Sequence, residues 1–389
     1  MDTIFPFGFP LPTAFYLTLY VLTLALHVLP MNYVLAGSIY LAVAGLFPVQ
    51  RAEEHDAQGA GEAAKPVPSV KGRLAPNYDA PLAAILRDWL PFAVSAAITA
   101  GVAPLLFVQI VYPQNFYTAN LLLSWRWMIV IPTLIAAFYL LYLLKSKTLR
   151  RWPYAARAAI GVATAACFLF VAFCWTANHL LSIAPEAWPT VYETQDVTPV
   201  LRFVVPRLLL WAGGAFAAMS TIAGWQLFVA NRRGKVSDVQ LGGEITKLAC
   251  AALGGLIVSV AAGSAVLALS QGRERELLFG PIALPYVVVA IVAAAAQAVL
   301  WGVVWRLGRC SCVLLSGVTA ACVIAIVCVA AARESFRLAH VDITRLYPAH
   351  DRSMEVGGFF AFAAFLVLNL ALIAACLWLA RTQHTGPKR

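Results

Sequence analysis

Residues 311–332 read SCVLLSGVTAACVIAIVCVAAA, a run that contains no charged side chain and no proline. A helix of about 20 predominantly apolar residues is long enough to cross the hydrocarbon core of a bilayer. This stretch therefore predicts a transmembrane helix. Similar runs recur along the chain, so we expect an all-α fold, a polytopic bundle of about nine transmembrane helices embedded in the lipid bilayer.

The composition favours burial in lipid over burial in a water-soluble core. Of the 389 residues, 61% are hydrophobic and only 12% are charged, whereas soluble domains average about 45–50% and about 25%. Each of the 18 acidic residues lies in a loop, in a tail or at the edge of an apolar run. An ionised group at mid-membrane costs on the order of 2.5–3.5 kcal/mol. We therefore expect no carboxylate in the interior of a span.

The net charge of +10 does not indicate nucleic-acid binding. The basic residues are scattered over short loops, without the basic stripe or motif that marks nucleic-acid-binding proteins. Most of the eight cysteines lie inside apolar runs, where a thiol behaves as a small hydrophobe. No Cys-x-x-Cys-His sequence occurs, which excludes a covalently attached c-type haem.

The expected spans number nine, and a polar segment, 49–85, follows the first of them. The spans are 11–48, 86–112, 118–144, 156–184, 199–230, 246–271, 281–305, 311–332 and 357–380. The first is too long for one straight crossing, and Pro30 lies in its middle. A turn at that point would have little polar loop, so we expect one long helix kinked at the proline. The loops are too short for a soluble domain, so 1–389 is expected to be a single membrane domain.

Lysine and arginine set the expected orientation. With the N-terminus outside, the inner segments hold nineteen of the 28 Lys and Arg residues and the outer segments hold seven. Positively charged loops stay in the cytoplasm. We therefore expect an N-terminus outside, a cytoplasmic 49–85 segment and a cytoplasmic C-terminus, in the cytoplasmic (inner) membrane.

His27 is the first candidate functional residue, because an ionisable group inside a span is rare and often functional. A neutral imidazole facing a bundle interior is also the usual axial ligand of a b-type haem, and His27 is the metal ligand we would expect here. The alternative is a histidine that hydrogen-bonds to a neighbouring helix near Pro30. The sequence leaves both interpretations open.

Three further candidates lie towards the outer ends of their helices. His179 ends the stretch Cys174-Trp175-Thr176-Ala177-Asn178-His179. Arg126 and Arg207 each lie roughly eight residues from an outer helix end, or about 12 Å deep at 1.5 Å per residue. The two arginines either extend (snorkel) to the outer lipid headgroups or bind an anionic or polar group, such as haem propionates or a quinone head.

These features together resemble subunit I of the cytochrome bd quinol oxidases, over the first five helices. His27 followed by Pro30 and Leu35-Ala36-Gly37 is similar to the haem-ligand helix of that family. Tyr112-Pro113-Gln114-Asn115-Phe116-Tyr117 is similar to its turn between helices two and three. Cys174-Trp175-Thr176-Ala177-Asn178 followed by an outer proline resembles the end of its helix four. Nine helices with the N-terminus outside also fit.

The chain departs from that family at most of its haem ligands. The third helix, around Ser124-Trp125-Arg126-Trp127-Met128, lacks the family's glutamates, and Phe203-Val204-Val205-Pro206-Arg207 stands where a second ligating histidine is expected. The late helices offer no methionine ligand, and the quinol-binding loop is largely missing. The resemblance therefore implies a bd-like subunit with at most one haem ligand, His27, and no oxygen reduction by this chain.

The leading functional prediction is a membrane subunit of a respiratory electron-transfer complex. It would exchange electrons between the quinone pool and an extracytoplasmic redox partner, a cytochrome or an iron–sulfur protein. The expected cofactor is a b-type haem (heme b), with quinone or quinol as substrate. The alternatives are a haem-free membrane anchor for an extracytoplasmic redox protein and, third, a transporter.

Overall fold

The structure is a computed structural model of the whole chain. It describes residues 5–51, 73–76, 78, 80–149, 152–270, 272, 275–276, 279–356, and then 360, 363–368, 371 and 375. Most of the ninth expected span, 357–380, lies outside these residues. Eight helices of the described part are long and apolar enough to cross a membrane. The all-α polytopic fold is therefore confirmed, and the chain is a multi-pass membrane protein.

The first half of the bundle is built around α1 (Leu11–Leu46), which contains Pro30 and runs as one continuous helix, as predicted. Helix α1 packs mainly on α2 (Pro81–Val111), α6 (Tyr154–Ser182) and α8 (Thr198–Arg232). Its buried face begins Thr13, Tyr16, Leu17, Tyr20 and Thr23, at spacings of three and four residues. That spacing places these side chains on one side of a helix, so α1 presents polar and aromatic groups to the interior.

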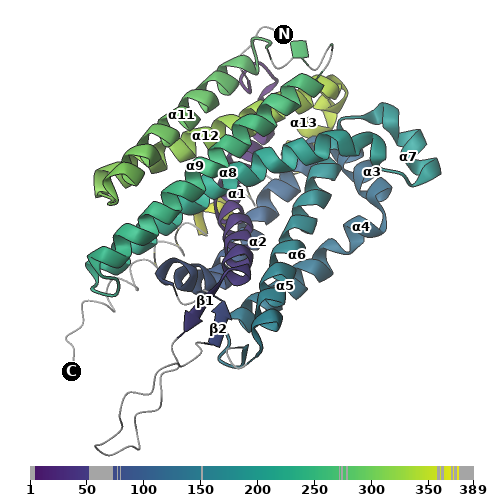
Figure 1. Cartoon of the computed structure of the whole chain (residues 1–389). Helices are drawn as coiled ribbons and strands as arrows, with labels where there is room; N and C mark the ends of the chain where they lie inside the picture. Colours follow the sequence, from purple (N-terminus) through teal and green to yellow (C-terminus); the bar gives the residue numbers. More distant parts are fainter. Residues whose placement is uncertain are drawn as a thin grey trace, which may run out of the picture.

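The second half consists of α8, α9 (Asp238–Leu269), α11 (Leu284–Leu307) and α12 (Cys312–His340), which run beside one another in Figure 1. Helices α8 and α9 cross so closely at Gly213 that a Cβ atom on this residue would collide with the carbonyl oxygen of Gly255. Such small-residue crossings are typical of helices packed in lipid. Local signals set several ends: Ser237 caps α9, Ser311 caps α12, and α11 ends at Gly308, whose φ is +59°.

Short elements cover the two ends of the bundle (Figure 1). One end carries η2 (Pro185–Ala187), α7 (Trp188–Thr194), η3 (Ile343–Leu346) and α13 (Tyr347–Glu355). The other carries the antiparallel strands β1 (Pro48–Arg51) and β2 (Arg73–Pro76), in which Pro48 pairs with Pro76 and Arg51 with Arg73. We call these the outer and inner ends, after the predicted orientation. The segment 52–72 of the expected polar loop lies outside the described residues.

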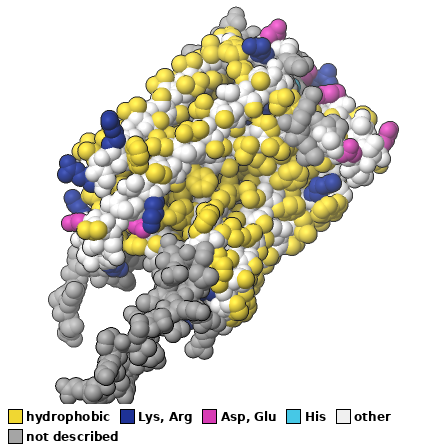
Figure 2. Space-filling view, viewed as in Figure 1, with side chains coloured by type: hydrophobic (Ala, Val, Ile, Leu, Met, Phe, Trp, Pro, Cys, Tyr) yellow, Lys and Arg dark blue, Asp and Glu magenta, His cyan; other side chains and the backbone are white. Residues whose placement is uncertain are grey.

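The side surface is apolar between the two ends. Large hydrophobic side chains such as Ile131, Val299 and Leu121 are exposed. Figure 2 shows hydrophobic side chains along the bundle, while Lys, Arg, Asp and Glu gather towards its two ends. This distribution fits a protein that lipid surrounds on its sides.

The third expected span was wrong at its outer end. The segment 118–144 is not one helix: α3 (Pro113–Leu123) ends at Ser124, and α4 (Trp125–Met128) and α5 (Val130–Lys145) follow. Ser124 has φ +52°, a rare backbone conformation for a residue with a side chain. The membrane-crossing part is Trp125–Lys145. Apolar residues on both sides of Ser124 hide the break from a hydropathy count.

The eighth expected span was too short. The predicted end at 332 stopped before the first charge, whereas α12 continues to His340 and includes the buried Glu334 and Arg337. The expectation that no carboxylate lies inside a span is therefore wrong for α12, and also for α9, which begins at Asp238 and includes the buried Glu244. Two arginines that we counted in an outer loop, Arg333 and Arg337, belong to α12.

Candidate functional site

The four predicted site residues do not form one site. His27 faces α2, while Arg126 lies in α4 and places its guanidinium 5.2 Å from the Trp125 ring. His179 lies on α6 and Arg207 on α8. The positive charge of Arg207 is near enough to His179 to interact with it electrostatically. The structure thus brings two of the four together, at the outer end.

His27 hydrogen-bonds to the neighbouring helix through Nδ1, which lies 2.9 Å from the carbonyl oxygen of Ala97. A carbonyl only accepts, so in the neutral ring Nδ1–H donates and Nε2 keeps its lone pair. A Cβ atom on Gly101 would lie 2.9 Å from the imidazole Cε1, so only glycine lets the ring approach α2 this closely. Histidines that bind metals are often oriented by such a carbonyl, so both interpretations of His27 remain open.

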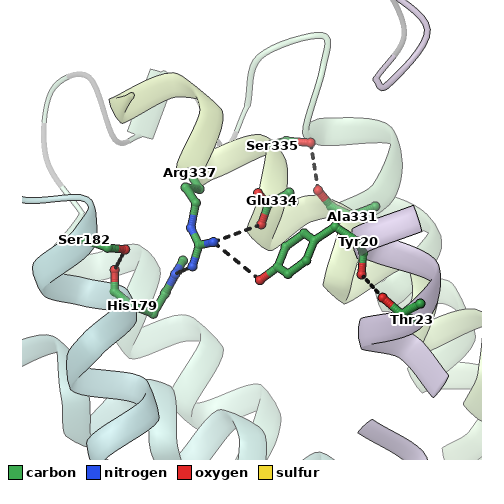
Figure 3. Close-up of polar contacts among 8 residues, drawn as sticks. All are labelled: Tyr20, Thr23, His179, Ser182, Ala331, Glu334, Ser335 and Arg337. Carbon is green, nitrogen blue, oxygen red and sulfur yellow. Dashed lines mark hydrogen bonds and ion pairs between the residues drawn. The ribbon is translucent and has the colours of Figure 1, made fainter. Parts of the chain in front are cut away.

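A buried charged cluster lies at the outer end, where α1, α6 and α12 meet (Figure 3). Arg337 of α12 places Nη2 2.6 Å from Nδ1 of His179, and its Nη1 lies 3.4 Å from the Tyr20 hydroxyl. The same Nη1 lies 3.9 Å from the Glu334 carboxylate. The guanidinium also lies 5.0 Å from the centre of the Tyr112 ring. We call Tyr20, Tyr112, His179, Glu334 and Arg337 the outer cluster.

The local helix sequence explains how this cluster forms. Glu334 and Arg337 are three residues apart on α12, so both project from one face of the helix. His179 lies in the last turn of α6, where Ser182 donates to its carbonyl oxygen at 2.7 Å. Tyr20 lies on the buried face of α1 described above.

Several polar atoms of the outer cluster are buried without a hydrogen-bond partner among the described residues. They include Nε2 of His179 and Nε of Arg337, while the Tyr112 hydroxyl and the Glu334 carboxylate face each other. Glu334 is 0% exposed, Arg337 3% and His179 4%. A buried polar group without a partner is costly and rare in a native structure. The outer cluster therefore has the properties of a site that a polar ligand completes.

The donor and acceptor roles follow from the contacts. Arginine has no acceptor atom, so Nδ1 of His179 accepts from Arg337. The hydrogen of the neutral imidazole is then on Nε2, which makes Nε2–H an unused donor. The Glu334 oxygens are acceptors that face the Tyr112 hydroxyl. The site thus offers both kinds of group to a ligand.

Several arginines lie near His179 of the outer cluster. Besides Arg337, both Arg207 and Arg333 lie within electrostatic reach of His179. The Arg207 guanidinium lies 5.3 Å from the centre of the Phe336 ring on α12. Glu334 contributes a negative charge to the cluster, 3.9 Å from Arg337. A ligand oxygen that carries negative charge is therefore favoured here.

The polar residues around the turn between α2 and α3 hold the helices together. Asn115 donates to the carbonyl oxygen of Ser182 at 2.8 Å, and Asn178 donates to Asn120 at 2.6 Å. These contacts join α3 to α6.

Sequence reasoning missed Glu334, Arg337 and Tyr20, and it considered Tyr112 only as part of the turn between helices two and three. The signal for Glu334 and Arg337 was their three-residue spacing, directly after an apolar run that contains no helix breaker. Among the described residues no group of three or more His, Cys, Asp or Glu side chains is arranged to hold a metal ion.

Comparison with known proteins adds no relative: no family model, no curated protein and no solved structure matches the chain. The fold and the site define a class, a multi-pass helical membrane protein with a buried charged cluster near one end. The similarity to subunit I of the cytochrome bd oxidases stays a prediction from the residues quoted above.

Proposed function

We propose that this chain is a membrane subunit of a respiratory electron-transfer complex in the cytoplasmic membrane. It exchanges electrons between the quinone pool and a redox partner on the outer face. One observation carries the proposal: the outer cluster buries unused donors on His179 and Arg337, together with a carboxylate, inside an apolar bundle. A quinone head reaches such a place through lipid, and its two oxygens suit the His179 and Arg337 donors.

A b-type haem on His27 is the cofactor that the bd resemblance implies. The residues fit it in one respect, because the bond to Ala97 orients the ring and leaves Nε2 as the ligating nitrogen. Such a haem supplies one-electron transfer. His27 would hold the haem through Nε2, and Gly101 leaves room for the imidazole of His27 beside α2.

Binding of a decyl-substituted benzoquinone to the purified protein tests the quinone part. We expect saturable binding to the wild type and a loss of affinity of about tenfold in His179→Ala, since a hydrogen bond to a ligand oxygen is lost. Lys247→Met, at the inner end, is the matched control and keeps wild-type affinity. Absence of saturable binding to the wild type would remove the proposal.

An optical spectrum tests the haem part separately. We expect a reduced-minus-oxidised b-type band in the wild type that disappears in His27→Ala. No band in the wild type would leave a quinone-binding subunit without its own haem.

The second candidate function is a haem-free anchor for an extracytoplasmic redox protein. It is favoured by the outer segment around α7, where Glu186, Glu193 and Asp196 are exposed. A hydrogen bond from Thr198 lowers the pKa of Asp196, which keeps that carboxylate ionised. Two results together would favour the anchor over the quinone-linked subunit. A basic haem or iron–sulfur protein would co-purify with the chain and be lost when the three acids are neutralised, and the quinone would not bind.

A further inference from the structure

We infer that the inner end of the second half of the bundle binds the headgroup of an anionic phospholipid. The site consists of five basic side chains at the two turns that join α8 to α9 and α11 to α12: Arg232, Arg233, Lys235, Arg306 and Arg309. We call these five residues the basic corner. Lipid binding there is independent of the proposed function, because the basic corner and the outer cluster lie at opposite ends of the bundle.

The fold brings the two turns together. A Cβ atom on Gly242, in the second turn of α9, would lie 3.0 Å from the carbonyl oxygen of Gly308, which follows α11. Val236 and Cys310, one from each turn, pack on the same hydrophobic cluster. The two arginines that flank Gly308 are therefore close to the start of α9, which the other three basic residues precede. Groups of about four to eight Lys and Arg beside a membrane helix are typical of sites for anionic lipids.

The charges of the basic corner are available to a ligand. All five side chains are exposed, and in the described part of the chain none of them forms an ion pair with a carboxylate. The exposed acid beside them, Asp238, accepts a hydrogen bond from Asn231 at 2.9 Å. The guanidinium of Arg232 lies 4.8 Å from the centre of the Phe228 ring, a contact that uses no hydrogen bond of the arginine. The excess of positive charge therefore favours an anion.

Basic residues at the inner end of the first half have protein partners instead. Nε of Arg87 lies 3.5 Å from Asp88, and the arginine side chain is only 11% exposed. Nζ of Lys145 donates to the main-chain carbonyl oxygen of Asp88 at 3.4 Å. Arg157 is buried. A place at the inner end therefore does not by itself leave a basic side chain available, and this distinguishes the basic corner.

Apolar side chains beside the basic corner favour a lipid over a free anion or an acidic protein. Trp305, directly before Arg306, is 51% exposed, and Val303 and Leu307 of the same helix are exposed as well. Tryptophan is typical of the membrane–water interface. Figure 2 shows Lys and Arg side chains at the ends of the helices and hydrophobic side chains along them. A phosphate group can thus accept hydrogen bonds from the arginines while its acyl chains lie along α11.

The test compares two phospholipids that share their acyl chains. The purified full-length protein in detergent is titrated with phosphatidylglycerol and with phosphatidylcholine, and the bound lipids are counted by native mass spectrometry. We expect the wild type to bind the first phosphatidylglycerol at least about tenfold more tightly, because each basic residue near an anionic headgroup contributes about a fivefold gain. The double variant Arg306→Gln with Arg309→Gln should lose about fivefold or more of this preference.

Two further variants and one competitor locate the binding. Lys145→Gln with Lys147→Gln removes two charges from the inner end of the first half and should keep the wild-type preference. Arg306→Lys with Arg309→Lys keeps both charges and should retain most of it. Inorganic phosphate in hundredfold excess over the lipid should not displace phosphatidylglycerol, because phosphate gains nothing from the apolar side chains.

Equal binding of the two lipids by the wild type overturns the inference. An equal loss in the glutamine variants of both halves overturns it too, because the whole inner end would then attract the lipid. Displacement by inorganic phosphate would mean a site for a free anion. If the arginine double variant does not fold, Arg306→Gln and Arg309→Gln decide singly, and an unchanged preference in both contradicts the inference. None of these outcomes changes quinone binding at the outer cluster, so the proposed function is tested separately.

Discussion

The two ends of the bundle each bury a glutamate, and the two are stabilised differently. Glu244 near the inner end is 5% exposed and has Lys247 at 2.8 Å, with the lysine side chain 48% exposed. Glu334 near the outer end is 0% exposed, and the side chain of its cation, Arg337, is only 4% exposed. Both carboxylates lie within helices that cross the membrane.

The difference shows that access to water decides what a buried charge requires. Lys247 reaches solvent, so the inner pair keeps part of its hydration and behaves much like a surface pair. The outer pair has lost nearly all contact with water, and its attraction must offset a desolvation cost of several kcal/mol per ion. A charge in that position is typical of a functional site in a membrane protein.

The largest expected effect is the removal of Arg337. Arg337→Met leaves the carboxylate of Glu334 without its nearest cation and takes the donor away from His179. We expect the free energy of unfolding to fall by about 3–5 kcal/mol, the cost of breaking a buried ion pair. A denaturant titration in detergent micelles measures it.

The double variant Glu334→Gln with Arg337→Met is the control for this prediction. It removes both charges, so it should recover part of the lost stability. A loss below about 1 kcal/mol in Arg337→Met would mean that the outer pair behaves like an exposed one, and the comparison between the two ends would fail.

The two ends also differ in the residue that fastens a peripheral segment to the bundle. At the outer end His350 of α13 is fully buried, with Nδ1 2.9 Å from the Thr13 hydroxyl and Nε2 3.3 Å from the carbonyl oxygen of Val111. At the inner end Tyr78, which precedes α2, donates to the carbonyl oxygen of Arg157 at 3.2 Å. Burial lowers the pKa of His350, and burial raises the pKa of Tyr78 to about 12.

These pKa directions predict that acid loosens the outer end alone. Undocked His350 titrates near its ordinary pKa of about 6.5, and the docked ring binds a proton less readily. Docking of α13 is therefore stable above that pH and weakens as the pH falls towards 5, by at most about 1.4 kcal/mol per unit. Tyr78 weakens its contact only above about pH 10, where the undocked phenol ionises.

Hydrogen exchange at pH 7 and pH 5, corrected for the intrinsic rate, measures this difference. Amides of α13 should lose protection at pH 5, while those at the start of α2, beside Tyr78, should not. His350→Gln should remove the pH response of α13. Equal loss of protection at both ends would mean that acid acts on the whole bundle and not on His350.

The sequence predicted the framework of the bundle better than its site, for a physical reason. Hydropathy and length identify spans because lipid imposes the same requirement on every crossing helix, and α1 runs through Pro30 as expected. The same rule ends a span at the first charge, so it excluded Glu334 and Arg337. Their burial depends on contacts with Tyr20, His179 and Tyr112, which come from other parts of the chain. Periodicity along one helix contains no information on such contacts.

The break at Ser124 was missed for a related reason. Apolar residues continue on both sides of it, so the hydropathy of the segment is that of one span. The break depends on a local backbone angle, φ +52°, and serine is not the residue that usually indicates a positive φ. His179 and Arg207 were selected as candidates because each is a lone charged or ionisable group in an apolar helix, a signal that does not depend on packing.

The smallest expected effect is the removal of Lys247 at the inner end. Lys247→Met takes away the cation of Glu244, but the lysine side chain is half-exposed and water can replace it at the carboxylate. We expect the free energy of unfolding to change by about 0–1 kcal/mol, as for exposed ion pairs. The same detergent titration measures it beside Arg337→Met. A loss as large as that of Arg337→Met would show that Glu244 is as isolated from water as Glu334, and complete burial would then no longer distinguish the outer cluster from the inner pair.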